Sequence, residues 1–252
     1  MEKNTIISNN DNTVYLNKED LDKLTISNQK STTSNKSTTS NKSTTPNKST
    51  TPNKSTKDEI LDFCIDNLNK ILNSWVDDKK TGGALREDRG TQTEKFVRDT
   101  IDLIGKKFNK KLFAKIGSND KKKLQIKIKE EIIQKEHQVD VHIYLDDKFI
   151  SIIECKSYLD ACYYERALND FTIFKKFGYK LKNYIFSLED SISKETLNFH
   201  NYMYDNICDK VIYVLDGKRS SAKPIYNKKF KKPVNKEKLK DFLNVIYALI
   251  DV

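Results

Sequence analysis

The chain of 252 residues contains no long apolar run. No stretch approaches the roughly 18–20 consecutive apolar residues that a membrane-spanning helix needs. The first residues, Met1–Glu2–Lys3–Asn4, also lack the pattern of a secretory signal. These absences predict an intracellular, cytoplasmic protein that does not enter a membrane.

Cysteine is scarce, and the cysteines that are present follow no recognised spacing. The chain has neither a Cys-x-x-Cys pair nor a Cys/His cluster, which argues against a zinc site and against a disulfide framework. We therefore expect reduced cysteines that are mostly buried. They are Cys64, Cys155, Cys162 and Cys208.

Apolar residues are also missing from segment 30–56, where a six-residue unit, Lys-Ser-Thr-Thr-Ser-Asn, recurs with Pro in place of the second Ser in later copies. A repeat so short and polar has nothing to bury, so it predicts a disordered linker. Residues 5–27 carry scattered apolar side chains, as in a short docking element or a weakly ordered arm. We divide the chain into a low-complexity N-terminal arm and linker, 1–56, and a folded domain, 57–252.

Within the folded domain, apolar spacing predicts helices and strands that alternate along the chain. A capping box at Thr56–Lys57–Asp58–Glu59 begins the first helix, and Gly82–Gly83 should break the chain before a polar loop that reaches residue 90. Strands embedded among helices predict an α/β fold with a mixed central β-sheet flanked by helices. The expected helices cover 56–75, 91–108, 158–177, 193–206 and 235–250, and the expected strands cover 111–117, 124–133, 139–145, 149–156, 183–188 and 210–215.

The most informative feature is a predicted hairpin around the polar turn Asp146–Asp147–Lys148. Residues 139–145 alternate apolar with polar, as a half-buried strand does, whereas residues 149–156 are nearly all apolar, as in a strand covered on both faces. If Leu145 pairs with Phe149 across a three-residue loop, Asp140 falls opposite Glu154. Lys156 then shares a face with Glu154, because side chains two apart in a strand point the same way.

Two facing carboxylates repel each other, so this arrangement favours a cation between them. Oxygen ligands of this kind suit Mg²⁺ or Mn²⁺, and a nearby amine can orient a water and stabilise developing negative charge. Asp140 and Glu154 as metal ligands, with Lys156 as helper, would form a phosphodiester-hydrolysing centre. A solvated surface ion pair is the plain alternative.

Asp140 followed by Glu154–Cys155–Lys156 resembles the PD-(D/E)XK nuclease superfamily, which includes most type II restriction endonucleases. Val139 stands where the motif has proline. The resemblance covers residues 91–215 and implies a mixed-sheet core, Mg²⁺-dependent DNA cleavage, and metal ligation by Asp140 and Glu154. It also implies a third carboxylate on the preceding helix. Glu94 is the candidate, although Thr91–Gln92–Thr93–Glu94 is itself a capping box in which the Glu would bind a backbone N–H.

Several other residues are candidates for binding double-stranded DNA. Ser157, Tyr158, Tyr164 and Arg166 follow the metal strand where a site usually opens, although the segment from Leu159 is also explained by core packing. Arg86 and Arg89 lie in the expected polar loop. The net charge of +10 favours a polyanionic partner and is concentrated in the basic segment 216–252, which either lies along phosphates or is a solvated loop. Its candidate contacts are Lys218, Arg219, Lys223, Lys228 and Lys229.

From these residues and this resemblance we expect a Mg²⁺-dependent type II restriction endonuclease that leaves 5′-phosphate ends. Palindromic cutting by such enzymes usually implies a homodimer. Two alternatives remain: a repair, recombination or mobile-element nuclease of the same superfamily, and a DNA-binding protein without catalysis. His142 shares the polar face of Asp140, and we expect it to be a hydrogen-bonded structural histidine.

Overall fold

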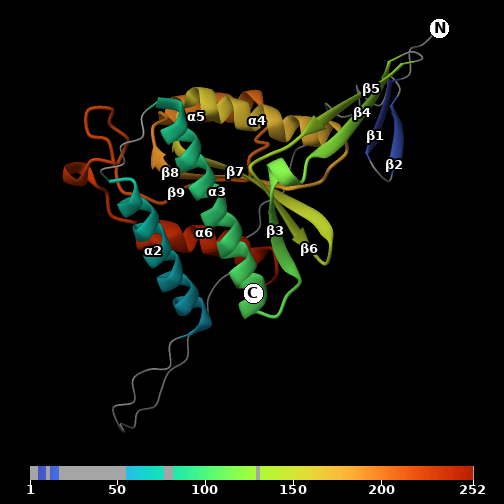
Figure 1. The fold of residues 1–252 in the computed structure, drawn as a ribbon. Helices are drawn as coiled ribbons and strands as arrows, with labels where there is room; N and C mark the ends of the chain where they lie inside the picture. Colours follow the sequence, from blue (N-terminus) through green and yellow to red (C-terminus); the bar gives the residue numbers. More distant parts are fainter. Residues whose placement is uncertain (1–4, 10–11, 17–54, 77–81, 129–130, 252) are drawn as a thin grey trace, which may run out of the picture.

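The structure, a computed structural model, has a five-stranded mixed sheet at its centre with the order β3-β6-β7-β8-β9 (Figure 1). Strands β3, β6 and β7 are antiparallel neighbours, and β7, β8 and β9 run parallel. This sheet confirms the predicted fold class. The strands are β3 (Leu112–Ile116), β6 (Val141–Leu145), β7 (Lys148–Leu159), β8 (Lys182–Asp190) and β9 (Lys210–Tyr213). The structure describes residues 5–9, 12–16, 55–76, 82–128 and 131–251.

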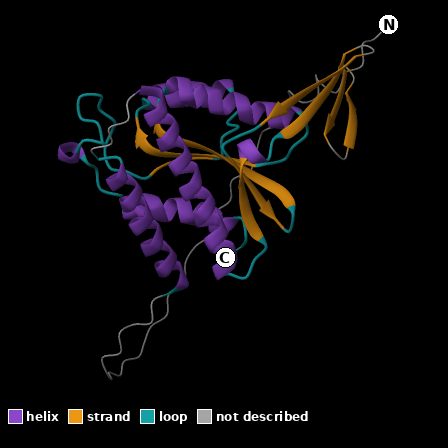
Figure 2. Cartoon of the chain, in the orientation of Figure 1, coloured by secondary structure: helices purple, strands orange, loops and turns teal. Residues whose placement is uncertain are grey.

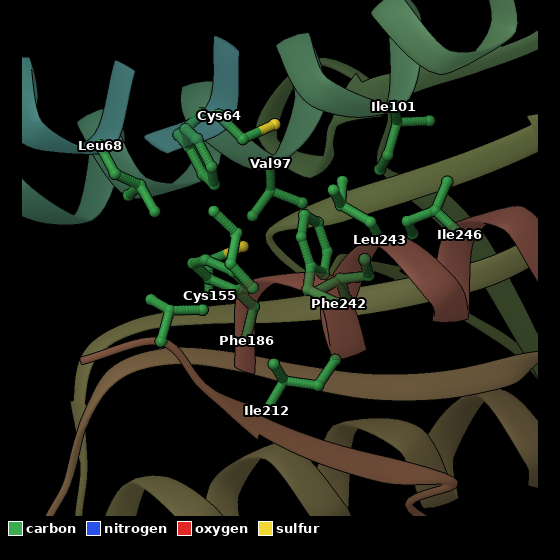
Figure 3. Packing of buried hydrophobic residues seen from close by; sticks show 14 of the residues in the cluster. Cys64, Leu68, Val97, Ile101, Cys155, Phe186, Ile212, Phe242, Leu243 and Ile246 are labelled. Atoms are coloured by element: carbon green, nitrogen blue, oxygen red, sulfur yellow. The ribbon is translucent and has the colours of Figure 1, made fainter. Parts of the chain in front are cut away.

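Helices cover both faces of this sheet (Figure 2). On one face α2, α3 and α6 pack through a large apolar core in which the rings of Phe186 and Phe242 lie 4.8 Å apart (Figure 3). On the other face α4 and α5 pack on a second core that contains Ile152, Ile185 and Phe171. The helices are α2 (Thr56–Ser74), α3 (Gly82–Lys107), α4 (Ala161–Lys176), α5 (Lys194–Met203) and α6 (Lys236–Ala248).

A second sheet, in the order β2-β1-β4-β5, projects from the body of the molecule (Figure 1). The prediction of one strand at 124–133 is wrong, because β4 and β5 form an antiparallel pair instead. Part of the predicted N-terminal arm lies in β1 and β2, which corresponds to the docking alternative. The repeat, up to residue 54, lies outside the described residues. The strands are β1 (Thr5–Asn9), β2 (Asn12–Leu16), β4 (Lys122–Ile128) and β5 (Glu131–His137).

Helix α3 is longer than the sequence predicted. The expected break at Gly82–Gly83 and the polar loop up to residue 90 are wrong, because α3 already begins at Gly82. Thr93 lies inside this helix, fully buried, and its hydroxyl donates to the Arg89 carbonyl at 2.8 Å. The capping-box reading of Glu94 is therefore wrong as well. The first helix is capped by Ser55, one residue before the predicted cap, and its side chain accepts the Asp58 N–H.

The hairpin that carries the site differs from the prediction in its turn but not in the strand register at the site. Leu145 pairs with Lys148 across a two-residue turn whose Asp146 and Asp147 have φ of 49° and 63°, so the predicted three-residue loop is wrong. A β-bulge next to Ile143 then shifts the register by one residue. Beyond the bulge, the pairing returns to the predicted register.

Candidate active site

The register of β6 and β7 brings the predicted carboxylates together. Val141 pairs with Ile153, and continuing this register by one residue places Asp140 opposite Glu154. Pairing with β6 ends here, while β7 continues to Leu159 beside β8. Asp140 Oδ2 accepts the Cys155 N–H at 2.8 Å, so the side chain of Asp140 satisfies a backbone donor that β6 no longer reaches.

Lys156 joins the two carboxylates. Its Nζ lies 3.0 Å from Asp140 Oδ2 and 2.5 Å from Glu154 Oε1. The Glu154 side chain is 5% exposed, whereas that of Asp140 is 26% exposed, so the cluster is buried on one side and open on the other. A solvated surface ion pair does not describe this site, because the Glu154 carboxylate is buried. A buried carboxylate needs a charged or hydrogen-bonded partner, which Lys156 provides.

The charges in the site shift one another's protonation. Burial and the neighbouring Asp140 carboxylate raise the pKa of Glu154. Burial favours the neutral amine of Lys156, but Glu154 and Asp140 outweigh it and hold the pKa of Lys156 above its usual value. Lys156 therefore remains an ammonium at neutral pH.

Glu94 belongs to the same electrostatic environment, although it comes from α3. Burial, followed by the charge of Asp140, raises the pKa of Glu94 to about 7, and Lys156 and Glu154 also act on it. A third carboxylate thus lies near enough to respond to the cluster. The role of Glu94 as a third carboxylate of the site stays a prediction.

A buried polar network holds the backbone that carries Asp140. His142 is fully buried, its Nδ1 lies 3.0 Å from Asp120 Oδ2, and its Nε2 accepts the Val139 N–H at 3.2 Å. Gly117 N–H also donates to the Asp140 carbonyl at 2.9 Å, and a Cβ on Gly117 would lie 1.8 Å from the Val139 carbonyl oxygen. The expectation of a structural histidine is confirmed.

The sequence predicted a half-buried strand here, but β6 is almost entirely buried, and the same network explains the difference. Tyr144 is only 7% exposed, and its hydroxyl and the Lys122 ammonium both bind the Asp120 carboxylate. Despite partial burial, hydrogen bonds from Tyr144, His142 and Lys122 lower the pKa of Asp120 to about 2. Sequence reasoning missed Asp120 because its polar neighbours made it resemble a loop residue, and no local signal distinguishes it.

The donor set fits a hard divalent cation in its chemistry. Among the described residues, the hydrogen bonds of Asp140 use Oδ2 and that of Glu154 uses Oε1, which leaves one oxygen of each carboxylate for a further cation. Within the same part of the chain, no three His, Cys, Asp or Glu side chains are spaced to hold a metal ion. Mg²⁺ is usually bound by one or two carboxylates and keeps several waters, so two ligands are sufficient.

The predicted DNA contacts separate into two groups. Arg89, Ser157 and Arg219 come together around a cleft of about 340 Å³ at the carboxyl end of β7. Tyr164, in contrast, is fully buried in the second core and donates its hydroxyl to Asn201, which agrees with the core-packing alternative. A fully buried side chain does not reach a phosphate, so Tyr164 belongs to the core and not to the predicted DNA interface.

The remaining candidates lie on the surface or support the basic segment. Arg166 is exposed on α4, and the side chain of Arg86 lies outside the described residues. Lys218 anchors its segment, because its Nζ donates to the Ile192 carbonyl at 2.8 Å and lies 3.5 Å from Asp190. Three further lysines of this segment are exposed, namely Lys223, Lys228 and Lys229.

The cysteines are less buried than the sequence predicted, because only two of the four are buried. All four cysteines are free, and Cys64 and Cys155 are buried, while Cys162 is exposed. Across the described residues, the structure contains no helix with the length and apolar character required to cross a bilayer.

The mixed sheet, with Asp140, Glu154 and Lys156 clustered at the end of a hairpin, has the arrangement that the sequence predicted. No family model matches the chain. A segment of 114 residues is 31% identical to the type II restriction enzyme DdeI of Desulfomicrobium norvegicum (strain DSM 1741 / NCIMB 8310). The similarity covers 40% of this chain and 47% of that enzyme, so the chain spans about half the length of the relative that it matches.

Proposed function

We propose that the protein is a Mg²⁺-dependent endodeoxyribonuclease that cuts double-stranded DNA at a specific sequence, as a type II restriction endonuclease. The observation that carries this proposal is the contact of one partly buried ammonium, Lys156, with the carboxylates of Asp140 and Glu154. The partial similarity to a type II restriction enzyme supports this assignment over a repair or mobile-element task.

Asp140 and Glu154 would hold the Mg²⁺, for which Mn²⁺ could substitute. When bound, the metal supplies Lewis acidity toward the scissile phosphate and makes nearby water more acidic. Lys156 is held beside both carboxylates by hydrogen bonds, so its positive charge is in place before the reaction begins. It would orient the attacking water and stabilise the negative charge that develops on the phosphate. In-line attack of water would leave a 5′-phosphate and a 3′-hydroxyl.

The DNA would approach the open side of the site, where Asp140 is partly exposed. Arg89, Ser157 and Arg219 border the cleft next to the carboxyl end of β7, and exposed lysines follow in the basic segment. Cutting both strands of a palindrome would place one such centre on each strand, which a homodimer provides.

The test is cleavage of plasmid DNA that carries all common short sequences, with Mg²⁺ and with chelator. Discrete bands whose ends map to one short sequence would support a restriction enzyme. Nicking without sequence preference, or resolution of branched DNA only, would support the repair or recombination alternative. Salt-sensitive DNA binding with no cleavage in Mg²⁺ or Mn²⁺ would contradict the proposal.

A further inference from the structure

We infer that the cleft beside the reaction centre is a subsite for a second phosphate of the bound strand, adjacent to the phosphate that is cut. The inference rests on the proposed function, because it takes DNA as the ligand. Ser157 and Tyr158 line the cleft and directly follow Lys156 in β7. Two residues of a strand span about 7 Å, which is comparable with the spacing of neighbouring phosphates along one DNA strand. Lys156 and Tyr158 also share a face of the strand.

The guanidinium groups in this cleft are held by aromatic rings. The guanidinium carbon of Arg219 lies 3.8 Å from the ring centroid of Tyr158. That of Arg89 lies 4.4 Å from the ring of Tyr226 and 5.3 Å from the ring of Trp75. Stacking uses the flat face of a guanidinium, so the N–H groups at the edge of Arg219 can still donate to an acceptor in the plane of the group. Two oxygens of a phosphate match these paired donors.

Trp75 is itself fixed, which makes this wall of the cleft rigid. It is 1% exposed, and its indole N–H donates to the side chain of Gln92 at 2.7 Å. Because Trp75 is fixed, Arg89 loses less side-chain freedom when an anion binds than a surface arginine without such a partner would lose.

The charge of the cleft favours an anion. Among the described residues that line the cleft, Glu189 is the one acidic side chain. It is 6% exposed and lies 2.6 Å from the Lys232 ammonium, so its charge is neutralised. Arg219 adds a positive charge to the cleft, and serine hydroxyls at positions 157, 220 and 221 add neutral donors.

The test is the salt dependence of DNA binding for Arg219→Gln, measured by fluorescence anisotropy of a labelled duplex in the presence of chelator. Loss of one phosphate contact should reduce the slope of log K against log salt by about 0.9. The matched control is Lys110→Gln, which removes one exposed positive charge just beyond the far end of α3. Melting temperatures near that of the wild type would show that both variants fold.

The two sources of phosphate are separated by the ligand. A set of duplexes carries a single neutral methylphosphonate linkage at successive positions of one strand. The linkage should lower the DNA affinity of the wild type at one position, and at that position it should not change the affinity of Arg219→Gln. The inference would be overturned if inorganic phosphate raised the melting temperature of the wild type above that of Arg219→Gln while no methylphosphonate position lowered the DNA affinity of the wild type.

The outcomes also separate this inference from the proposed function. If the wild type cuts DNA and Arg219→Gln keeps the wild-type slope, the subsite is wrong and the nuclease stands. If Arg219→Gln loses one unit of slope and the wild type never cuts, the phosphate subsite stands and the nuclease is wrong.

Discussion

At the scale of single residues, Lys156 decides the charge balance of the site. Without its ammonium, Asp140 and the buried Glu154 would face each other with no cation between them. Removing one partner of a fully buried ion pair costs about 3–5 kcal/mol of the free energy of unfolding, and the cost here is smaller because Lys156 and Asp140 are partly exposed. Loss of a charge that stabilises the transition state lowers kcat by roughly 10²–10³-fold.

We therefore predict that Lys156→Met lowers both the cleavage rate and the denaturant midpoint. Single-turnover cleavage and urea unfolding measure these two effects. Lys148→Met is the matched control, because Lys148 is an exposed residue of the same strand. Cleavage by Lys156→Met within a few-fold of the wild type would contradict the assigned role.

Glu94 gives a prediction on pH. Its carboxyl group, with a pKa of about 7 in the folded protein against a usual 4.5, keeps a proton that the unfolded chain releases. Its contribution to stability is therefore lost as the pH rises from about 4.5 to about 7. Metal binding needs the ionised carboxylates, so Mg²⁺ affinity should rise across the upper part of this range.

We predict that calorimetric titration of the wild type shows tighter Mg²⁺ binding at about pH 8 than at about pH 6, with release of protons. In Glu94→Gln this pH dependence should be smaller. An identical pH dependence in the two proteins would show that the ionisation of Glu94 does not affect Mg²⁺ binding.

Residues whose roles follow from local sequence were predictable, and those whose roles need the tertiary fold were not. Asp140, Glu154 and Lys156 lie on one hairpin, so strand period and register were sufficient to bring them together. Asp120 acts on His142 across 22 positions of the chain. No periodicity in its own segment indicates that contact.

At the scale of elements, the hairpin shows how a correct register can follow from an incorrect turn. The turn is one residue shorter than expected, and the bulge next to Ile143 adds one residue to β7. The two differences cancel before Asp140 is reached. For helix α3 the local signal led to a wrong prediction, because Gly82 and Gly83 have low helix propensity and the helix nevertheless includes them.

The network around β6 gives a prediction at this scale. Asp120 has its pKa lowered from 3.8 to about 2, so its ionised form stabilises the fold above about pH 4, and this contribution is lost as the pH falls toward 2. The shift corresponds to about 2 kcal/mol. Asp120→Asn should lower the free energy of unfolding at neutral pH by roughly this amount.

The difference in stability between the wild type and Asp120→Asn should shrink below about pH 4, as measured by urea unfolding at a series of pH values. Asp146→Asn, in the exposed hairpin turn, serves as the control. A difference that stays constant down to about pH 3 would show that the Asp120 charge does not support the network.

At the scale of the whole molecule, both apolar cores and all residues of the proposed site lie between residues 55 and 251. Deletion of residues 1–54 removes β1 and β2, which add a hairpin to the edge of β4. We predict that the truncated protein, 55–252, folds and cuts with a rate within a few-fold of the full chain. A folded truncation that binds DNA without cutting would assign a catalytic task to the N-terminal segment.

The mixed sheet and its order of elements were predictable at this scale, because alternating periodicity extends over the whole folded domain. The cleft was not, because it unites the end of α2, the start of α3, the end of β7 and the basic segment. The sequence marked Arg89 and Arg219 as separate candidates, and only the fold places them around one cavity.

The central claim is that Asp140, Glu154 and Lys156 form a metal-dependent nuclease centre. Its most direct test is digestion of unmethylated phage DNA with Mg²⁺, with and without chelator, by the wild type, Glu154→Ala and Lys156→Ala. The account predicts discrete fragments from the wild type that disappear with chelator and with either substitution. Fragments that persist in either folded variant, or a folded wild type that binds these DNAs and leaves them intact, would contradict it.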